Sequence, residues 1–129
     1  MMKKILIAED NPVNRELLRE LLELRGYEVA EACDGQEALR ALEKSRPDLL
    51  LLDIGMPVMD GYETVRRIRA DATLATLPVL AVTAYAMRGD EEKILATGFN
   101  GYLSKPIDSG ALHQKLDLIF AATKKHDAS

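Results

Sequence analysis

The sequence predicts an α/β fold built on a parallel sheet. From Lys4 onward, short apolar runs alternate with amphipathic helical stretches, which is typical of strands connected by helices. The most apolar run is LLLL at residues 49–52, and Asp53 follows it directly. A short apolar run bounded by turn residues suits a strand buried on both faces, as interior strands of parallel sheets are. Asp53 is therefore expected at the carboxyl end of an interior strand, where ligand sites of open α/β sheets collect.

The stretch NPVNRELLRELLELRG, residues 11–26, is the most clearly marked helix. Asn11 is a good cap, Pro12 suits the first turn and Gly26 suits the stop. We expect one apolar face, formed by Val13, Leu17, Leu18, Leu21 and Leu22.

The other elements follow in chain order. The predicted strands are 3–8 (KKILIA), 27–32 (YEVAEA), 48–53, 77–84 (LPVLAVTA) and 101–106 (GYLSKP). The predicted helices are 34–47, which starts with the capping-box spacing of Asp34 and Glu37, then 61–71, 89–98 and 108–121. The polar stretch TKKHDAS, residues 123–129, is expected to be a tail after a single domain at 1–122.

Composition excludes several classes of protein. The chain has 129 residues, is 47% hydrophobic and carries a net charge of −4, which suits one soluble domain and argues against direct binding to nucleic acid. Cys33 is the single cysteine, so an internal disulfide is impossible, and a lone cysteine is most often a small buried residue. No apolar run approaches the ~20 residues of a membrane span. The apolar stretch near the amino end, Ile5 to Ala8, is too short for a signal peptide, so a cytoplasmic protein without a membrane partner is expected.

Polar residues lie at the carboxyl ends of four of the five predicted strands. They are Glu9, Asp10, Asp53, Thr83 and Lys105. If the first and third strands are neighbours, three carboxylates meet at one edge of the sheet, where they must share a proton or bind a hard cation. Oxygen ligands without nearby His or Cys favour Mg²⁺, or alternatively Mn²⁺, over zinc.

Each of these residues also has an ordinary structural explanation. Asp53 alone would be taken for a loop residue or helix cap, Thr83 for a β-branched strand residue and Lys105 for a surface lysine. Their coincidence at the same edge of one sheet favours a functional site.

The segments ILIAED, LLLLDIGMPVMDG, LAVTAYA and GYLSKPI, taken together, closely resemble the receiver domains of two-component response regulators, the CheY-like family. The resemblance covers the chain from Lys3 to Ile119. It implies a doubly wound (βα)5 fold of the flavodoxin-like type with sheet order 2-1-3-4-5, a topology for which a member of this family is a standard example.

The resemblance also implies a role for each site residue. Asp53 would accept a phosphoryl group from a histidine kinase or a histidine phosphotransfer protein, while Thr83 and Lys105 would contact the phosphoryl oxygens. Asp10 would bind Mg²⁺ directly, Glu9 through water, Asp53 through its carboxylate and Gly55 through its backbone carbonyl.

The implied output is a changed protein-binding surface. Thr83 and Tyr102 would form the switch, although Tyr102 by default could be a core aromatic. The downstream protein target is unknown from sequence, the chain is expected to be a monomer or weak dimer, and its catalysis is limited to its own phosphorylation and dephosphorylation. The family also implies a cis bond before Pro106 and places Gly55 and Tyr85 beside the path of the water that removes the phosphoryl group. We expect slow loss of phosphate, because Gly55 has no side chain to hold that water and Tyr85 is bulky enough to crowd its path.

Two other classes of protein share parts of this pattern. A flavodoxin-like cofactor binder would need a phosphate loop where EDNPVNR is acidic, and a phosphatase of the haloacid-dehalogenase type would need an acid where Gly55 stands. Glu9 replaces the aspartate of many relatives, which lengthens its reach. Similar receivers occur in hybrid kinases and in DivK-like regulators, and Met1 with the short tail favours a stand-alone protein. His113 is expected to be a surface residue of the last helix.

Overall fold

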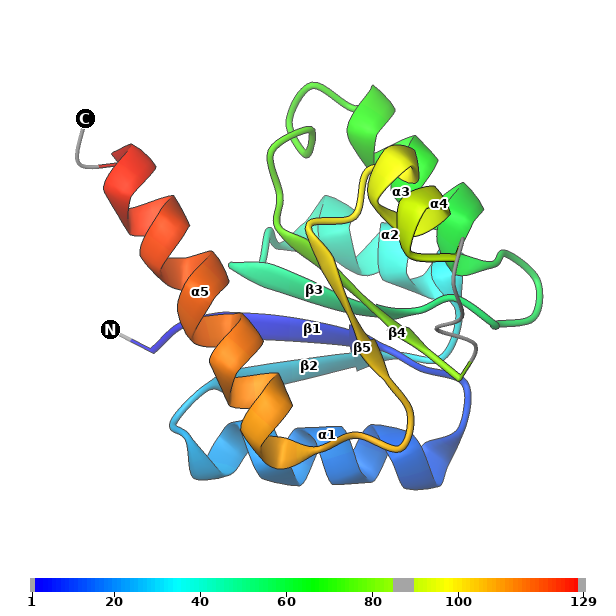
Figure 1. The fold of residues 1–129 in the computed structure, drawn as a ribbon. Coiled ribbons are helices and arrows are strands. Elements are labelled where there is room, and N and C mark those ends of the chain that lie inside the picture. Colours follow the sequence, from blue (N-terminus) through cyan, green and yellow to red (C-terminus); the bar gives the residue numbers. More distant parts are fainter. Residues whose placement is uncertain (1, 85–89, 128–129) are drawn as a thin grey trace.

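The computed structural model describes residues 2–84 and 90–127, without the side chains of residues 123–127. Five parallel strands form one sheet in the order β2-β1-β3-β4-β5, and helices cover both of its faces (Figure 1). The strands are β1 (Lys4–Ala8), β2 (Glu28–Ala32), β3 (Leu49–Asp53), β4 (Val79–Thr83) and β5 (Gly101–Ser104). The helices are α1 (Pro12–Leu24), α2 (Gly35–Lys44), α3 (Gly61–Ala70), α4 (Asp90–Thr97) and α5 (Ser109–Asp127).

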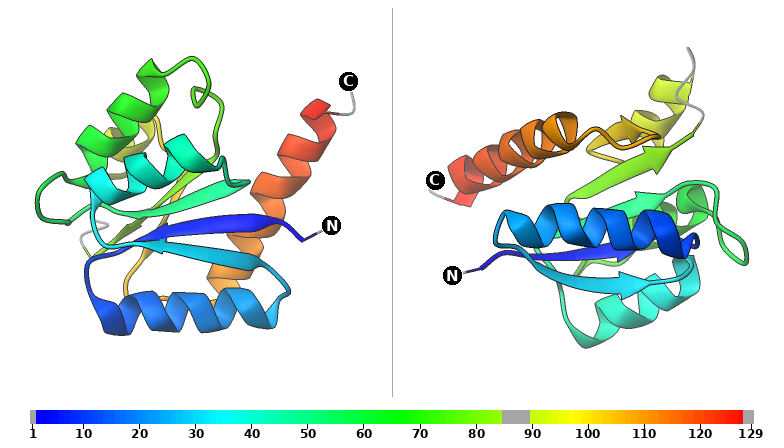
Figure 2. Two further views of the ribbon diagram at one scale, coloured as in Figure 1. Left: turned by 180° about the vertical axis from the view of Figure 1, so that it is seen from behind. Right: turned by 90° about the horizontal axis from the view of Figure 1, so that it is seen from below.

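Two apolar layers enclose the sheet, one on each side. Helices α1 and α5 lie over one face, and α2, α3 and α4 lie over the other, as the views from behind and below also show (Figure 2). The leucines at 49 and 51 pack toward α1 and α5, whereas those at 50 and 52 pack toward the other three helices. All four are fully buried, so β3 is fixed in the core up to the residue before Asp53.

Capping residues set the helix starts that the sequence predicted. Asn11 Oδ1 accepts the N–H groups of Val13 and Asn14, at 2.9 and 3.2 Å, and Asp34 accepts the N–H of Glu37 at 2.8 Å. Gly26 has a φ of +84°, which suits glycine after the last turn of α1.

Two expectations were wrong, and the predicted apolar face of α1 is only partly covered. Val13 and Leu17 are exposed, at 72% and 42%, because the five apolar residues of this face span about half the circumference of α1 and the sheet covers only part of that arc. The last helix continues to Asp127, six positions beyond the predicted end, since no glycine or proline follows Gly110. Cys33 is exposed, because it follows the carboxyl end of β2, an edge strand of the sheet.

Within the described ranges, no helix is both long enough and apolar enough to cross a bilayer.

Candidate functional site

The carboxyl ends of β1 and β3 bring three carboxylates together. Glu9 and Asp10 follow β1, and Asp53 ends β3, its neighbour in the sheet. One oxygen from each carboxylate can be chosen so that all three lie within 4.8 Å of one another. Glu9 is 1% exposed and Asp53 4%, whereas Asp10 is open to solvent. The predicted convergence of these three residues is therefore confirmed.

Lys105, which follows β5, is the cation of this cluster. Its Nζ lies 3.1 Å from Glu9 Oε2 and 3.2 Å from Asp53 Oδ2. Burial acts to lower the pKa of Lys105, but the hydrogen bond to Glu9 and the charges of Glu9 and Asp53 outweigh this effect, so the net pKa is raised. Lys105 therefore stays charged, and the peptide bond between it and Pro106 is cis, as the resemblance implied.

The carboxyl group of Glu9 has a raised pKa. Burial raises its pKa most, and the nearby charge of Asp53 raises the pKa further, although the Lys105 side chain and the Asn11 N–H favour the charged form. Its Oε2 accepts no hydrogen bond of good geometry from the described residues, even though Lys105 Nζ is close. A buried carboxylate oxygen without a hydrogen bond beside two further carboxylates fits a hard divalent cation of the Mg²⁺ type, because such ions take oxygen ligands.

Asp53 is held in a fixed orientation by its neighbours. Its Oδ1 accepts the backbone N–H of Gly55 at 3.1 Å, while its Oδ2 faces Lys105. The start of α3 supports this loop from behind, because Gly61 packs so closely that a Cβ there would lie 2.7 Å from Ile54 Cα and 2.9 Å from the Asp53 carbonyl oxygen.

Thr83 and Tyr102 lie on the two strands beyond β3. Thr83 ends β4, is 5% exposed and pairs in register with Ser104 of β5. The Tyr102 hydroxyl donates to Glu91 Oε1 of α4, and the Tyr102 ring centroid lies 5.7 Å from Lys115 Nζ of α5. That hydrogen bond to Glu91 is the main reason why the pKa of Tyr102 is raised. Tyr102 is therefore a partly buried link between β5 and two helices, and Tyr85 lies outside the described residues.

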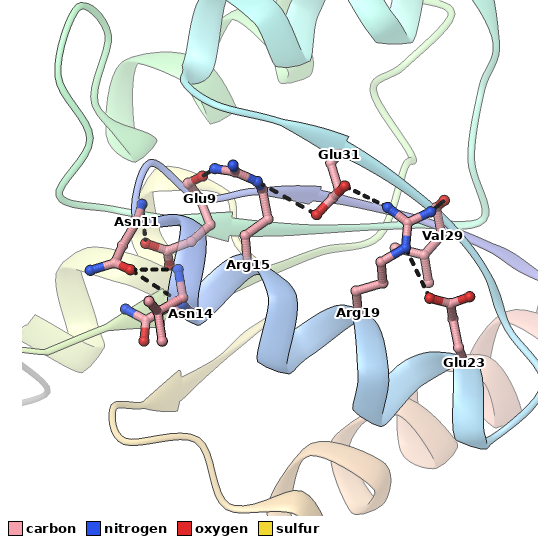
Figure 3. A network of polar contacts seen from close by, with 9 residues as sticks. Glu9, Asn11, Asn14, Arg15, Arg19, Glu23, Val29 and Glu31 are labelled. Atoms are coloured by element: carbon pink, nitrogen blue, oxygen red, sulfur yellow. Dashed lines mark hydrogen bonds and ion pairs between the residues drawn. The ribbon is translucent and has the colours of Figure 1, made fainter.

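Sequence reasoning missed Arg15 of α1. Its Nη1 donates to the backbone oxygen of Glu9 at 2.8 Å, and its Nε lies 3.5 Å from Glu31 Oε1 of β2 (Figure 3). No periodicity marks such a contact, because a charged residue on a helix normally faces solvent.

The fold and this site define a class of protein: a doubly wound α/β domain in which an acidic cluster and a lysine meet at the carboxyl ends of the strands. A family model described as the response regulator receiver domain matches residues 5–117. The chain belongs to that family, and it is a receiver domain of two-component signal transduction.

Similar proteins agree with this assignment. The chain is 46% identical to the polar-differentiation response regulator DivK of Brucella anthropi over 107 residues, which cover 83% of this chain and 87% of the relative. The receiver domain of a sensor histidine kinase from Pseudomonas aeruginosa, solved with a magnesium ion coordinated in its active site cleft, is 40% identical with a TM-score of 0.83, covering 90% of this chain and 95% of that one. The chemotaxis protein CheY4 of Vibrio cholerae is 33% identical with a TM-score of 0.85, covering 91% and 98%.

Proposed function

We propose that Asp53 is the phosphoryl acceptor of this receiver and that Glu9, Asp10 and Asp53, with the Gly55 carbonyl, hold Mg²⁺ beside it. The observation that carries the proposal is the position of Asp53, whose carboxylate faces Lys105 at 3.2 Å and shares a 4.8 Å cluster with two more carboxylates. Mn²⁺ has similar ligand preferences and is expected to substitute.

The chemistry asks for alignment more than for a strong nucleophile. An Asp53 oxygen forms the new bond to phosphorus as the bond from phosphorus to the donor's histidine nitrogen breaks, and the electron pair stays on that nitrogen. A bound Mg²⁺ supplies neutralisation of the charge on the phosphoryl oxygens. Gly55 N–H and Lys105 orient the Asp53 carboxylate before transfer, and Lys105 faces the place where the incoming phosphoryl oxygens gather.

The surface beside α1 suits the protein that donates the phosphoryl group. A cavity of about 300 Å³ opens next to the site, and its lining includes Glu9, Asn14, Leu17 and Lys105. Val13 and Leu17 expose apolar side chains at this edge, although α1 is otherwise anchored in the core. A histidine kinase or phosphotransfer protein that packs on this part of α1 would bring its histidine to Asp53.

The output is proposed to pass through Thr83 and Tyr102. Phosphorylation draws the Thr83 hydroxyl toward Asp53, and the Tyr102 ring leaves Glu91 and turns into the vacated space. Because Tyr102 contacts both α4 and α5, this rotation changes the surface formed by residues 90–98, 100–104 and 108–120, which a downstream protein reads. Thr83→Ala is expected to accept phosphate but to lose the change in amide chemical shifts that beryllofluoride with Mg²⁺ produces at Tyr102 and α4. Shift changes at Tyr102 and α4 that persist in the variant would contradict this route.

Phosphorylation by acetyl phosphate tests the acceptor assignment. Intact-mass measurement is expected to show one phosphoryl adduct that requires Mg²⁺ or Mn²⁺, is absent in Asp53→Asn and is retained in Asp48→Asn. Asp48 is the matched control because it lies at the opposite end of β3 and binds the Lys4 N–H instead. An adduct in Asp53→Asn, or one that survives EDTA, would refute the proposal.

A further inference from the structure

Arg15 fixes the peptide group that joins two of the proposed metal ligands. The carbonyl oxygen of Glu9 belongs to the peptide plane between Glu9 and Asp10, and Arg15 Nη1 donates to it at 2.8 Å. The position of this oxygen relative to Glu9 is set by ψ of Glu9, the same backbone angle that sets where Asp10 lies relative to the Glu9 side chain. Holding the oxygen therefore limits where the Asp10 carboxylate can lie relative to the Glu9 carboxylate.

The other end of Glu9 is held by the sheet. Its N–H donates to the Ala32 carbonyl of β2 at 3.1 Å, and its Oε1 accepts the Asn11 N–H at 3.2 Å. The pairings of β1 end at Ala8, and within residues 2–84 and 90–127 no backbone N–H donates to the Glu9 carbonyl. Arg15 supplies the hydrogen bond that β1 no longer receives from the sheet.

Arg15 is itself held in place. Its side chain is 19% exposed, and its Nε lies 3.5 Å from Glu31 Oε1. Glu31 also binds Arg19 of α1, which contacts Glu23 and the Val29 carbonyl but not Glu9 (Figure 3). Glu31 offsets the positive charge of Arg15 next to a cation site and fixes the guanidinium toward the Glu9 carbonyl.

We propose that Arg15 is a positioning residue that orients the Glu9–Asp10 peptide for Mg²⁺ binding. The inference rests on the proposed metal site. Among the residues that the structure describes, the Arg15 side chain binds the Glu9 carbonyl and Glu31, and it makes no hydrogen bond or ion pair with the proposed ligand oxygens. Its effect is therefore expected on metal affinity and not on phosphoryl transfer. Mutation of a residue that orients a metal ligand typically costs about 10- to 100-fold in metal affinity or activity. For the loss of a single contact to the backbone, we expect Mg²⁺ affinity to fall about tenfold.

The charge of Arg15, considered alone, predicts the opposite change in Mg²⁺ affinity. Removing a cation close to the acidic cluster would strengthen the attraction of Mg²⁺, so a tighter site in Arg15→Met would mean that electrostatics dominates. Positioning predicts a weaker site. The two explanations are therefore separated by the direction of one measured dissociation constant.

The experiment is a Mg²⁺ titration of the ¹⁵N-labelled 129-residue chain, followed through the amides of Asn11 and Gly55. Arg15→Met is expected to raise the Kd about tenfold, and Arg15→Gln, which is too short to reach the Glu9 carbonyl, is expected to do the same if the first variant does not fold. Arg19→Met is the matched control, because it removes the other arginine bound to Glu31 and leaves the Glu9 carbonyl bond in place.

Two further readouts separate positioning from general loss of structure. The ¹³C carbonyl resonance of Glu9 is expected to move in Arg15→Met without Mg²⁺ and to stay unchanged in Arg19→Met. At saturating Mg²⁺, the rate of phosphorylation of Arg15→Met by acetyl phosphate is expected to return to the wild-type rate.

The possible failures are distinguishable. A wild-type protein that does not bind Mg²⁺ would overturn the proposed metal site itself. Normal binding by the wild type with an unchanged or lower Kd in Arg15→Met, or an equal loss in Arg19→Met, would overturn the role of Arg15 alone.

Discussion

Lys105→Met removes the cation that holds the acidic cluster together. Lys105 Nζ lies 3.1 Å from Glu9 and 3.2 Å from Asp53, and each attraction is about 5 kcal/mol at the effective dielectric constant of ~20 that suits such sites. The cost of taking the charges from water offsets much of this, and breaking a buried pair typically costs about 3–5 kcal/mol. Because the Lys105 side chain is 21% exposed, solvent screens the pair, and we expect a loss of about 2 kcal/mol in the free energy of unfolding.

Mg²⁺ should reverse much of that loss. In the variant the ion would be the remaining source of positive charge for the buried carboxylates, so saturating Mg²⁺ is expected to stabilise Lys105→Met more than it stabilises the wild type. The assay is urea unfolding at near-neutral pH, followed by circular dichroism, with Mg²⁺ and with EDTA.

Lys115→Met is the control for the loss of one lysine. Lys115 lies on α5 near Tyr102, away from the acidic cluster, and its removal is expected to change the free energy of unfolding by less than about 0.5 kcal/mol. An unchanged or raised stability of Lys105→Met in EDTA would refute the reasoning, as would a deficit of the same size with and without Mg²⁺.

Three further predictions concern the fold and are measured by urea unfolding. Val58→Gly is expected to raise the free energy of unfolding by about 1 kcal/mol, because valine there has a φ of +68° and an exposed side chain; a loss would show that its backbone is not strained. Gly61→Ala is expected to lower it by about 2 to 3 kcal/mol, because the added Cβ meets backbone at Ile54 and Asp53, and full stability would contradict that close approach. Burial, together with the charge of Arg25 and despite that of Asp117, holds the pKa of His113 below its ordinary value of 6.5. The unfolded chain then binds the proton first, so the stability contributed by neutral His113 is present above that value and is lost as the pH falls below it; His113→Leu should lose less stability over the same range, and an equal loss would contradict this assignment.

The parallel sheet and most of the site follow from patterns in the sequence, whereas the strand order was implied by the resemblance to receiver domains. Leu49 to Leu52 predicted an interior strand because both faces must be apolar, and a parallel sheet brings the residues after its strands to one edge. Glu9, Asp53 and Lys105 could therefore be grouped before any distance was known.

The rest depends on how elements are rotated and how far they extend. Val13 lies on the arc of α1 that the sheet does not reach, which periodicity alone cannot distinguish from the buried arc. The contact of Arg15 with the Glu9 carbonyl depends on the direction of a single peptide plane, and side-chain patterns do not report backbone orientation.

The pairing of Lys105 with Glu9 also has a consequence for protein synthesis. The two residues are 96 positions apart, and Asp53 precedes Lys105 by 52. A chain emerging from the ribosome thus presents the carboxylates of Glu9 and Asp53 long before the lysine that pairs with both of them. Under the proposed chemistry, an unfinished or truncated chain that ends before Lys105 carries an acceptor aspartate without its cation, so competence to receive a signal arises only once translation has passed the fifth strand.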